Sequence, residues 1–167
     1  MRVGVAALWL AVLISVLPVT SGAQTAVEYY WWKAAERAEG GDLAGAREDL
    51  QRAAGYATDP DTAFAIQGKL VDVDTALAFR EYARSLREST QVSEAAAVEE
   101  HATRYARASF GGGDGYLGFN PAEVLKLYAT HLRSVGSAGE AARIDELSER
   151  YERIQAEHFR RLQQRQR

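Results

Sequence analysis

The stretch YARSLRESTQVSEAAAVEEHATRYARA, residues 82–108, recurs without a gap as YATHLRSVGSAGEAARIDELSERYERI, residues 128–154, with 11 identical residues among 27. A third, weaker copy, YYWWKAAERAEGGDLAGAREDLQRAAGYA, occupies residues 29–57. Each copy is predicted to form a helix, a short turn and a second helix, because good helix formers flank a break rich in Gly or Ser. A unit of this length that recurs is typical of stacked helical hairpins.

The three copies share small side chains at the positions where two antiparallel helices would touch. A close helix crossing leaves no room for a large side chain at such a position. Larger residues are expected to fill the space between the crossings: Tyr30, Leu50, Phe79, Leu86, Val98, Leu125, Leu132 and Ile144. The nine small residues are Ala34, Ala83 and Ala129 in the first helices, and Ala46, Ala95, Ala141, Ala53, Ala102 and Ser148 in the second helices.

Start and stop signals along the chain predict seven helices and no strand. The clearest start is Asn120 followed by Pro121, which is an N-cap residue with proline at the first helical position. We therefore expect an all-α fold of about three antiparallel helical hairpins, with a long C-terminal helix that caps the array. The predicted helices lie near residues 26–39, 43–56, 60–70, 75–88, 93–108, 121–135 and 138–163.

The first 23 residues have the three-part pattern of a secretory signal peptide. Arg2 precedes an apolar run over residues 6–19, and Ser21 and Ala23 provide small residues before the expected cut. Residues 24–167 are then expected to form a single helical-repeat domain, periplasmic or secreted, with no stable membrane insertion after cleavage. An uncleaved anchor is the alternative, although the run is shorter than the roughly 20 residues of a membrane-spanning helix.

Composition argues against several classes of function. The chain has no cysteine and a net charge of −3, which excludes disulfides, thiolate metal sites and thiol catalysis and argues against nucleic-acid binding. His101, His131 and His158 lack the spacing of a metal site. The glycine-rich segment 109–120 contains G-x-G-x-x-G, but it follows a predicted helix instead of a strand. We therefore expect no metal, no cofactor and no enzymatic activity.

The small residues at three equivalent sites, the turn Gly40-Gly41-Asp42 and the later Pro60 resemble tetratricopeptide repeats. The spacings of 49 and 46 residues are longer than usual and are similar to the extended repeats of kinesin light chain and its bacterial relatives. Residues 58–74 and 109–120 account for the extra length. The resemblance implies a superhelix that acts as a non-catalytic scaffold for a peptide or protein, here in the bacterial envelope.

In such repeats the first helix of each pair lines an inner groove, and here that surface is expected to be basic. Arg80, Arg84 and Arg87 lie four and three residues apart and so share one helical face. A basic groove would hold an acidic segment through charge-assisted hydrogen bonds. The alternative is a solvated face on which Glu81 and Glu88 neutralise the arginines. The candidate ligand-binding residues are Trp31, Arg80, Arg84, Arg87, Lys126 and Arg133.

Two aromatic segments are further candidates for contact with a partner. Within Tyr29-Tyr30-Trp31-Trp32, Trp31 is a candidate aromatic anchor for a partner in the groove. The alternative is structural, with Tyr30 and Trp32 packed against the second helix and the C-terminal elements. Tyr116 and Phe119 of the glycine-rich loop are candidate loop contacts. These segments favour an alternative function, a structural or assembly subunit that docks inside a larger envelope complex. We expect Arg160 and Arg161 on the outer face of the C-terminal helix.

Overall fold

The computed structural model describes residues 22–110 and 119–166, and within them every regular element is an α-helix. No helix among the described residues is long and apolar enough to cross a membrane. Residues 1–21 of the predicted signal peptide and Tyr116 lie outside the described residues. The six helices are α1 (Gly22–Glu39), α2 (Leu43–Tyr56), α3 (Pro60–Glu88), α4 (Val92–Phe110), α5 (Pro121–Ser134) and α6 (Ala138–Arg165).

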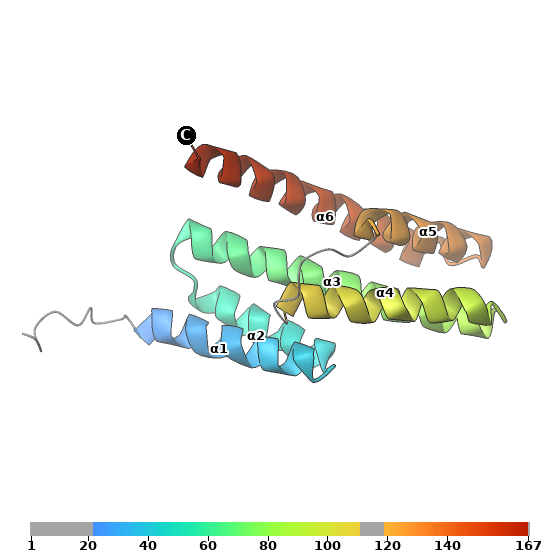
Figure 1. Cartoon of the computed structure of the whole chain (residues 1–167), viewed down its shortest axis with the longest axis horizontal. Helices are drawn as coiled ribbons and strands as arrows, with labels where there is room; N and C mark the ends of the chain where they lie inside the picture. Colours follow the sequence, from blue (N-terminus) through green and yellow to red (C-terminus); the bar gives the residue numbers. More distant parts are fainter. Residues whose placement is uncertain (1–21, 111–118, 167) are drawn as a thin grey trace, which may run out of the picture.

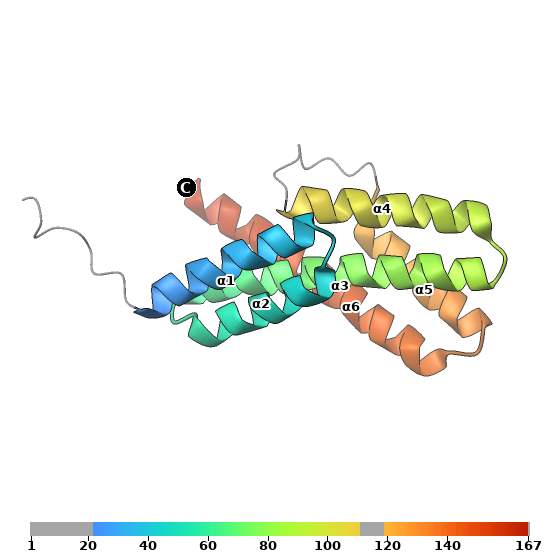
Figure 2. The same ribbon diagram turned by 90° about the horizontal axis from the view of Figure 1, so that it is seen from below.

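Consecutive helices pack as three pairs, α1 with α2, α3 with α4 and α5 with α6 (Figure 1). The helix α3 joins them, because it also contacts α2, α5 and α6. Viewed at right angles, α3 runs through the middle of the molecule and α6 crosses it obliquely (Figure 2). The all-α prediction is confirmed, whereas the tetratricopeptide-like superhelix stays a prediction.

The prediction of two helices at 60–70 and 75–88 is wrong, because α3 is one helix of 29 residues. The segment between them, Val71-Asp-Val-Asp74, contains neither Gly nor Pro, so nothing in its backbone interrupts the helix. Val71 and Val73 are also buried, which adds apolar packing where a turn was expected. The extra residues before the second copy of the repeat therefore lengthen a helix.

The turns within the three pairs have the same backbone geometry. Gly41, Thr90 and Gly136, each two residues after the end of a helix, have positive φ angles of 85°, 63° and 86°. In each turn the next residue donates its N–H five residues back, from Asp42 to Arg37, from Gln91 to Leu86 and from Ser137 to Leu132. This is the Schellman pattern that closes a helix C-terminus. The turns are 49 and 46 residues apart, the spacing of the sequence repeat.

The core is built around the small residues that the copies share. All nine of them are buried, none exposing more than 2% of its surface. Phe79 of α3 lies at the centre of the larger side chains, with ring centroids 5.8 Å from Tyr105 and 6.0 Å from Phe119. The alignment of the three copies therefore identified nine buried positions of the core, and their assignment to helix crossings stays a prediction.

Candidate functional site

The predicted basic residues contact five different residues in four parts of the chain. Arg80 donates to the Gly41 carbonyl at 2.8 Å, and Lys126 binds Glu152 at 2.8 Å. The remaining ion pairs of this set join Arg84 to Glu81, Arg87 to Glu99, and Arg133 to Asp145.

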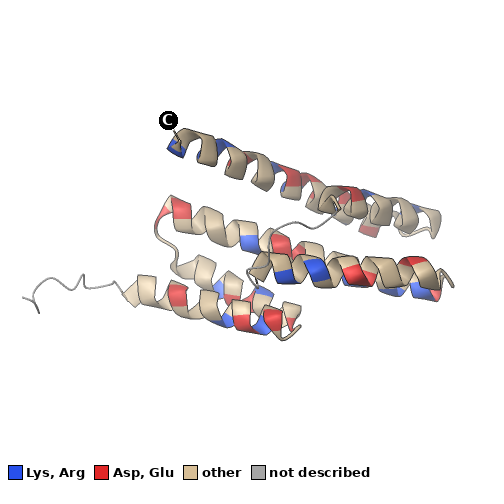
Figure 3. Ribbon diagram, in the orientation of Figure 1, with Lys and Arg blue, Asp and Glu red and all other residues tan. Residues whose placement is uncertain are grey.

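These contacts distribute the predicted groove residues over separate neighbours. Arg80 reaches the α1–α2 turn, Arg87 reaches α4, and Lys126 and Arg133 reach α6. The Glu152 carboxylate, which accepts a hydrogen bond from Lys126, raises the pKa of that ammonium group. Figure 3 shows Lys and Arg interspersed with Asp and Glu along the helices. Four of the five predicted cations are thus paired with a carboxylate of the chain, Arg80 is hydrogen-bonded to a carbonyl, and the role of all five in binding stays a prediction.

One hollow, of about 470 Å³, lies between the C-terminal half of α3, α5 and the start of α6. Arg84 is the member of the predicted basic set that lines it. At its edge the Ser85 hydroxyl lies 2.9 Å from Nε2 of His131. A serine activated by histidine also needs a third group that orients the imidazole. Among the described ion pairs and hydrogen bonds, none joins a carboxylate to His131, so this pair lacks that orienting group.

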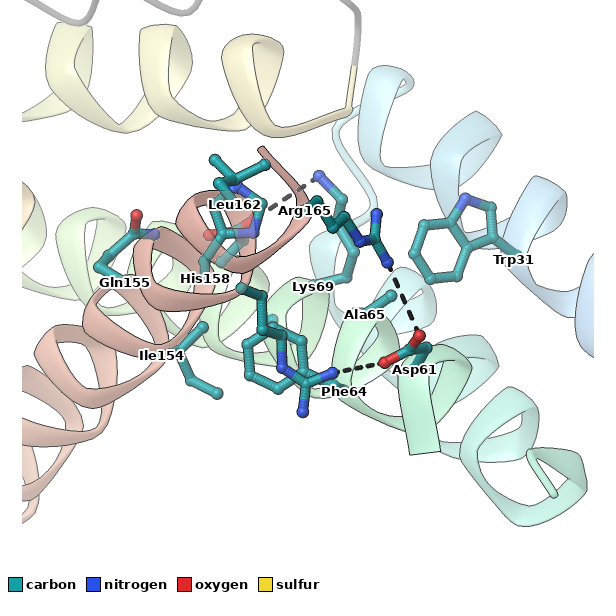
Figure 4. Close-up of a pocket in the computed structure, with 13 residues that line it drawn as sticks. Trp31, Asp61, Phe64, Ala65, Lys69, Ile154, Gln155, His158, Leu162 and Arg165 are labelled. Atoms are coloured by element: carbon teal, nitrogen blue, oxygen red, sulfur yellow. Dashed lines mark hydrogen bonds and ion pairs between the residues drawn. The ribbon is translucent and has the colours of Figure 1, made fainter. Parts of the chain in front are cut away.

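A second hollow, the α1–α3–α6 cleft, has a volume of about 480 Å³ and lies between the N-terminal half of α3 and the C-terminal half of α6, with Trp31 of α1 at one side. Figure 4 shows the Trp31 ring directed toward Ala65 and Arg165. The side chains from α3 are Asp61, Phe64, Ala65, Gly68, Lys69 and Asp72, and those from α6 are Ile154, Gln155, His158, Arg161, Leu162 and Arg165.

The spacing of the lining residues follows from helix geometry. On α6 the residues recur every three or four positions from Ile154 to Arg165, which places them on one face. The same spacing runs along α3 from Asp61 to Asp72. In the sequence, the apolar stripe of the last helix continues past Ile154, and this continuation was the available signal for the cleft. It was insufficient, because only the fold identifies the opposing face of α3.

The mouth of the cleft carries an ion-pair network between α3 and α6. Arg161 Nη1 lies 2.6 Å from Asp61 Oδ1, and Arg165 Nη2 lies 3.6 Å from Asp61 Oδ2. The Arg161 guanidinium also stacks 4.0 Å from the centre of the Phe64 ring. The prediction that Arg161 lies on the outer face of the last helix is therefore wrong. Arg160 does not line the cleft and pairs with Glu157.

The inner end of the cleft holds a half-buried polar cluster. Asp72 accepts a hydrogen bond of 2.7 Å from the Tyr105 hydroxyl, and Lys69 Nζ lies 3.6 Å from the same carboxylate. Lys69 also donates to the Ser109 carbonyl. Burial raises the pKa of Asp72 above its ordinary value, although Tyr105 and Lys69 act in the opposite direction. Burial likewise raises the pKa of Tyr105. The Lys69 ammonium group is thus already engaged by partners within the protein.

The aromatic segment at the start of the chain is divided among three environments. Tyr30 stacks on Tyr56 of α2 with ring centroids 5.9 Å apart, and Trp31 lines the cleft. Tyr29 and Trp32 are 54% and 62% exposed, so the expectation that Trp32 packs on the second helix is wrong. Both rings therefore expose more than half of their residue surface on α1, although the Tyr29 ring also contacts Tyr30 and Lys33.

The remaining candidates have structural surroundings. Phe119 packs against Phe79 and lies 4.2 Å from the His101 ring, so it belongs to the core. In residues 22–110 and 119–166, no three His, Cys, Asp or Glu side chains lie together in a way that could hold a metal ion.

Comparisons of the chain with protein-family models, with curated proteins and with solved structures gave no match.

Proposed function

We propose that the chain is a non-catalytic scaffold of the bacterial envelope that binds a segment of a partner protein in the α1–α3–α6 cleft. The observation that carries this proposal is the cleft of about 480 Å³, with Trp31, Phe64, Ile154 and Leu162 as its large apolar side chains. Binding sites commonly combine an apolar wall with a few polar groups that orient the ligand. The Ser85–His131 pair without an orienting acid offers no comparable support for catalysis.

The repeat pattern supports the scaffold role independently of the cleft. We propose that the three helix pairs form a superhelix of the tetratricopeptide type, in keeping with the recurrence of the same turn at Gly41, Thr90 and Gly136. Such arrays present an extended surface to a partner. Export rests on the signal-peptide pattern of residues 1–23.

An assembly subunit is the second candidate function, and the exposed rings of Tyr29 and Trp32 favour it. Large exposed aromatic side chains that lie together are typical of interaction surfaces. In this case α1 would dock permanently on a neighbouring subunit.

A cleft-filling substitution distinguishes the two. Ala65 is exposed and lines the cleft, so Ala65→Trp should block the site without disturbing the core. Ala142→Trp is the matched control, since Ala142 is also an exposed helical alanine but lies outside the cleft. Crosslinking pull-downs from native envelopes should lose the partner with Ala65→Trp and retain it with Ala142→Trp.

The same experiment can contradict the proposal. Equal capture by both variants would show that the cleft is not the binding site. Loss of capture with Tyr29→Lys and Trp32→Lys, together with normal capture by Ala65→Trp, would favour the assembly subunit.

A further inference from the structure

We propose, on the basis of the binding role above, that the cleft recognises a peptide segment with an apolar side chain next to an acidic one. In the free protein, Asp61 would occupy the position of the partner's carboxylate between Arg161 and Arg165. Figure 4 shows Asp61 at the mouth of the cleft, between the ends of side chains that come from α6.

The ion pairs of Asp61 with Arg161 and Arg165 can readily be replaced by ion pairs with a carboxylate of the partner. Its side chain is 70% exposed, and it is held by Arg161 at 2.6 Å and by Arg165 at 3.6 Å. Exposed ion pairs contribute little stability, about 0–1 kcal/mol, so replacing Asp61 by another carboxylate costs the fold little. Asp61 lies in the first turn of α3, where it can turn toward solvent and remain favourably placed at the helix N-terminus.

Arg161 is oriented before any ligand arrives. Its Nε donates to Glu157 Oε1 at 2.9 Å, while its guanidinium lies over the Phe64 ring. The hydrogen bond from Arg161 is the main reason that the pKa of Glu157 lies below its ordinary value. With one edge fixed by Glu157 and one face on Phe64, the Nη1 edge stays directed at Asp61. A planar guanidinium held in this way suits carboxylate recognition.

The apolar part of the ligand fits the wall next to this arginine pair. Trp31 stands on one side, and Ile154 and Leu162 stand on the other, with Ala65 between them on α3. Leu162 is 44% exposed, so part of this wall is open to an incoming side chain. The ligand's apolar group would therefore lie within a residue or two of the carboxylate that binds Arg161 and Arg165.

Lys69 is not expected to supply the carboxylate site, although it also lines the cleft. It is paired with Asp72 at 3.6 Å, donates to the Ser109 carbonyl and lies 5.1 Å from the centre of the Phe110 ring. These contacts hold its charge at the inner end of the cleft. The selectivity for an acidic residue is thus assigned to the two arginines at the mouth.

The test is a selection of peptides from a random display library on the immobilised full-length chain. Enriched peptides should carry Asp or Glu beside Leu, Ile, Phe or Trp. Replacing that acid by its amide should weaken binding about tenfold or more, because a charge-assisted hydrogen bond is lost. Asp61→Asn should tighten binding severalfold, since the internal competitor loses its charge.

Charge reversal in the protein supplies the control. Arg161→Glu with Arg165→Glu should abolish enrichment of acidic peptides and allow enrichment of peptides with Lys or Arg at that position. Arg160→Glu should leave selection unchanged, because Arg160 lies outside the cleft. Circular dichroism identifies any variant that fails to fold, and Asp61→Asn provides a second readout that needs no arginine change.

The outcomes separate this inference from the proposed function. Enriched peptides that lack an acid, or that bind the Asp61→Asn chain no better, would overturn the carboxylate inference and leave a peptide-binding cleft. If selection enriches no peptide that Ala65→Trp blocks, both proposals fail. Binding of free aliphatic or aromatic acids at the same affinity as the peptides would assign the cleft to small molecules and would also overturn the inference.

Discussion

Replacing Ala129 by leucine tests the packing of the repeat directly. Ala129 has 0% of its surface exposed, and leucine adds three carbon atoms at that position. If the interior had room, their burial would stabilise the protein by about 2.4 kcal/mol, at about 0.8 kcal/mol per carbon. Because protein interiors are close-packed, the added atoms should instead displace the neighbouring helix and destabilise by about 1–3 kcal/mol. The direction of the effect therefore decides between a tight crossing and a loose one.

The comparison variant is Ala142→Leu, which makes the same chemical change at an exposed position of α6. Leucine and alanine have similar helix propensities, so this control should stay close to the parent protein. For a chain of this size, the Ala129→Leu variant should melt roughly 2 to 12 °C lower, at about 2–4 °C per kcal/mol. Urea unfolding followed by circular dichroism should show a lower midpoint with an unchanged slope. Equal stability of the two variants would refute the assignment of Ala129 to a tight helix crossing.

Two further predictions concern Asp72 and Thr90. Burial raises the pKa of Asp72 above 3.8 in the folded state, so the folded chain binds this proton more tightly than the unfolded chain does. The free energy of unfolding should therefore fall as the pH rises from about 3.8 through that raised pKa. The total loss should be about 1.4 kcal/mol for every tenfold difference between the proton affinities of Asp72 in the folded and the unfolded chain. The Asp72→Asn variant should show a flatter dependence of its urea midpoint on pH, and parallel profiles would contradict the role of burial. Thr90→Gly should raise the melting temperature, because a β-branched residue at φ 63° stands where the other two turns have glycine. Unchanged or lower thermal stability would mean that Thr90 carries no strain.

Local sequence signals predicted the helix pairs well. The start at Pro121, the turns and the nine small buried residues all depend on near neighbours in the chain or on the repeat. The predicted break at residues 71–74 was wrong, since no glycine or proline interrupts the backbone there and α3 is continuous. The continuous helix follows from the burial of Val71 and Val73, which depends on contacts between distant elements.

The candidate site was less predictable for the same reason. Trp31 was identified from its residue type, and the structure places it at the cleft. Asp61, Phe64 and Arg161 were missed, because their meeting depends on how α6 crosses α3. The i,i+4 spacing shows which residues share one face of a helix, but it does not show which face of another helix packs against them. The arginines of α3 share a face by spacing, yet their contacts lead to different neighbours.

The continuous α3 has a consequence for how the protein unfolds. In a linear array of repeats, an end unit can detach while the rest stays folded, so unfolding proceeds gradually from the ends. Here α3 contacts helices of all three pairs. Detaching either the α1–α2 pair or the α5–α6 pair would therefore expose apolar side chains of α3 to water. Loss of any pair therefore weakens the remaining two. The chain should behave as one cooperative unit, whose native state is kept or lost as a whole.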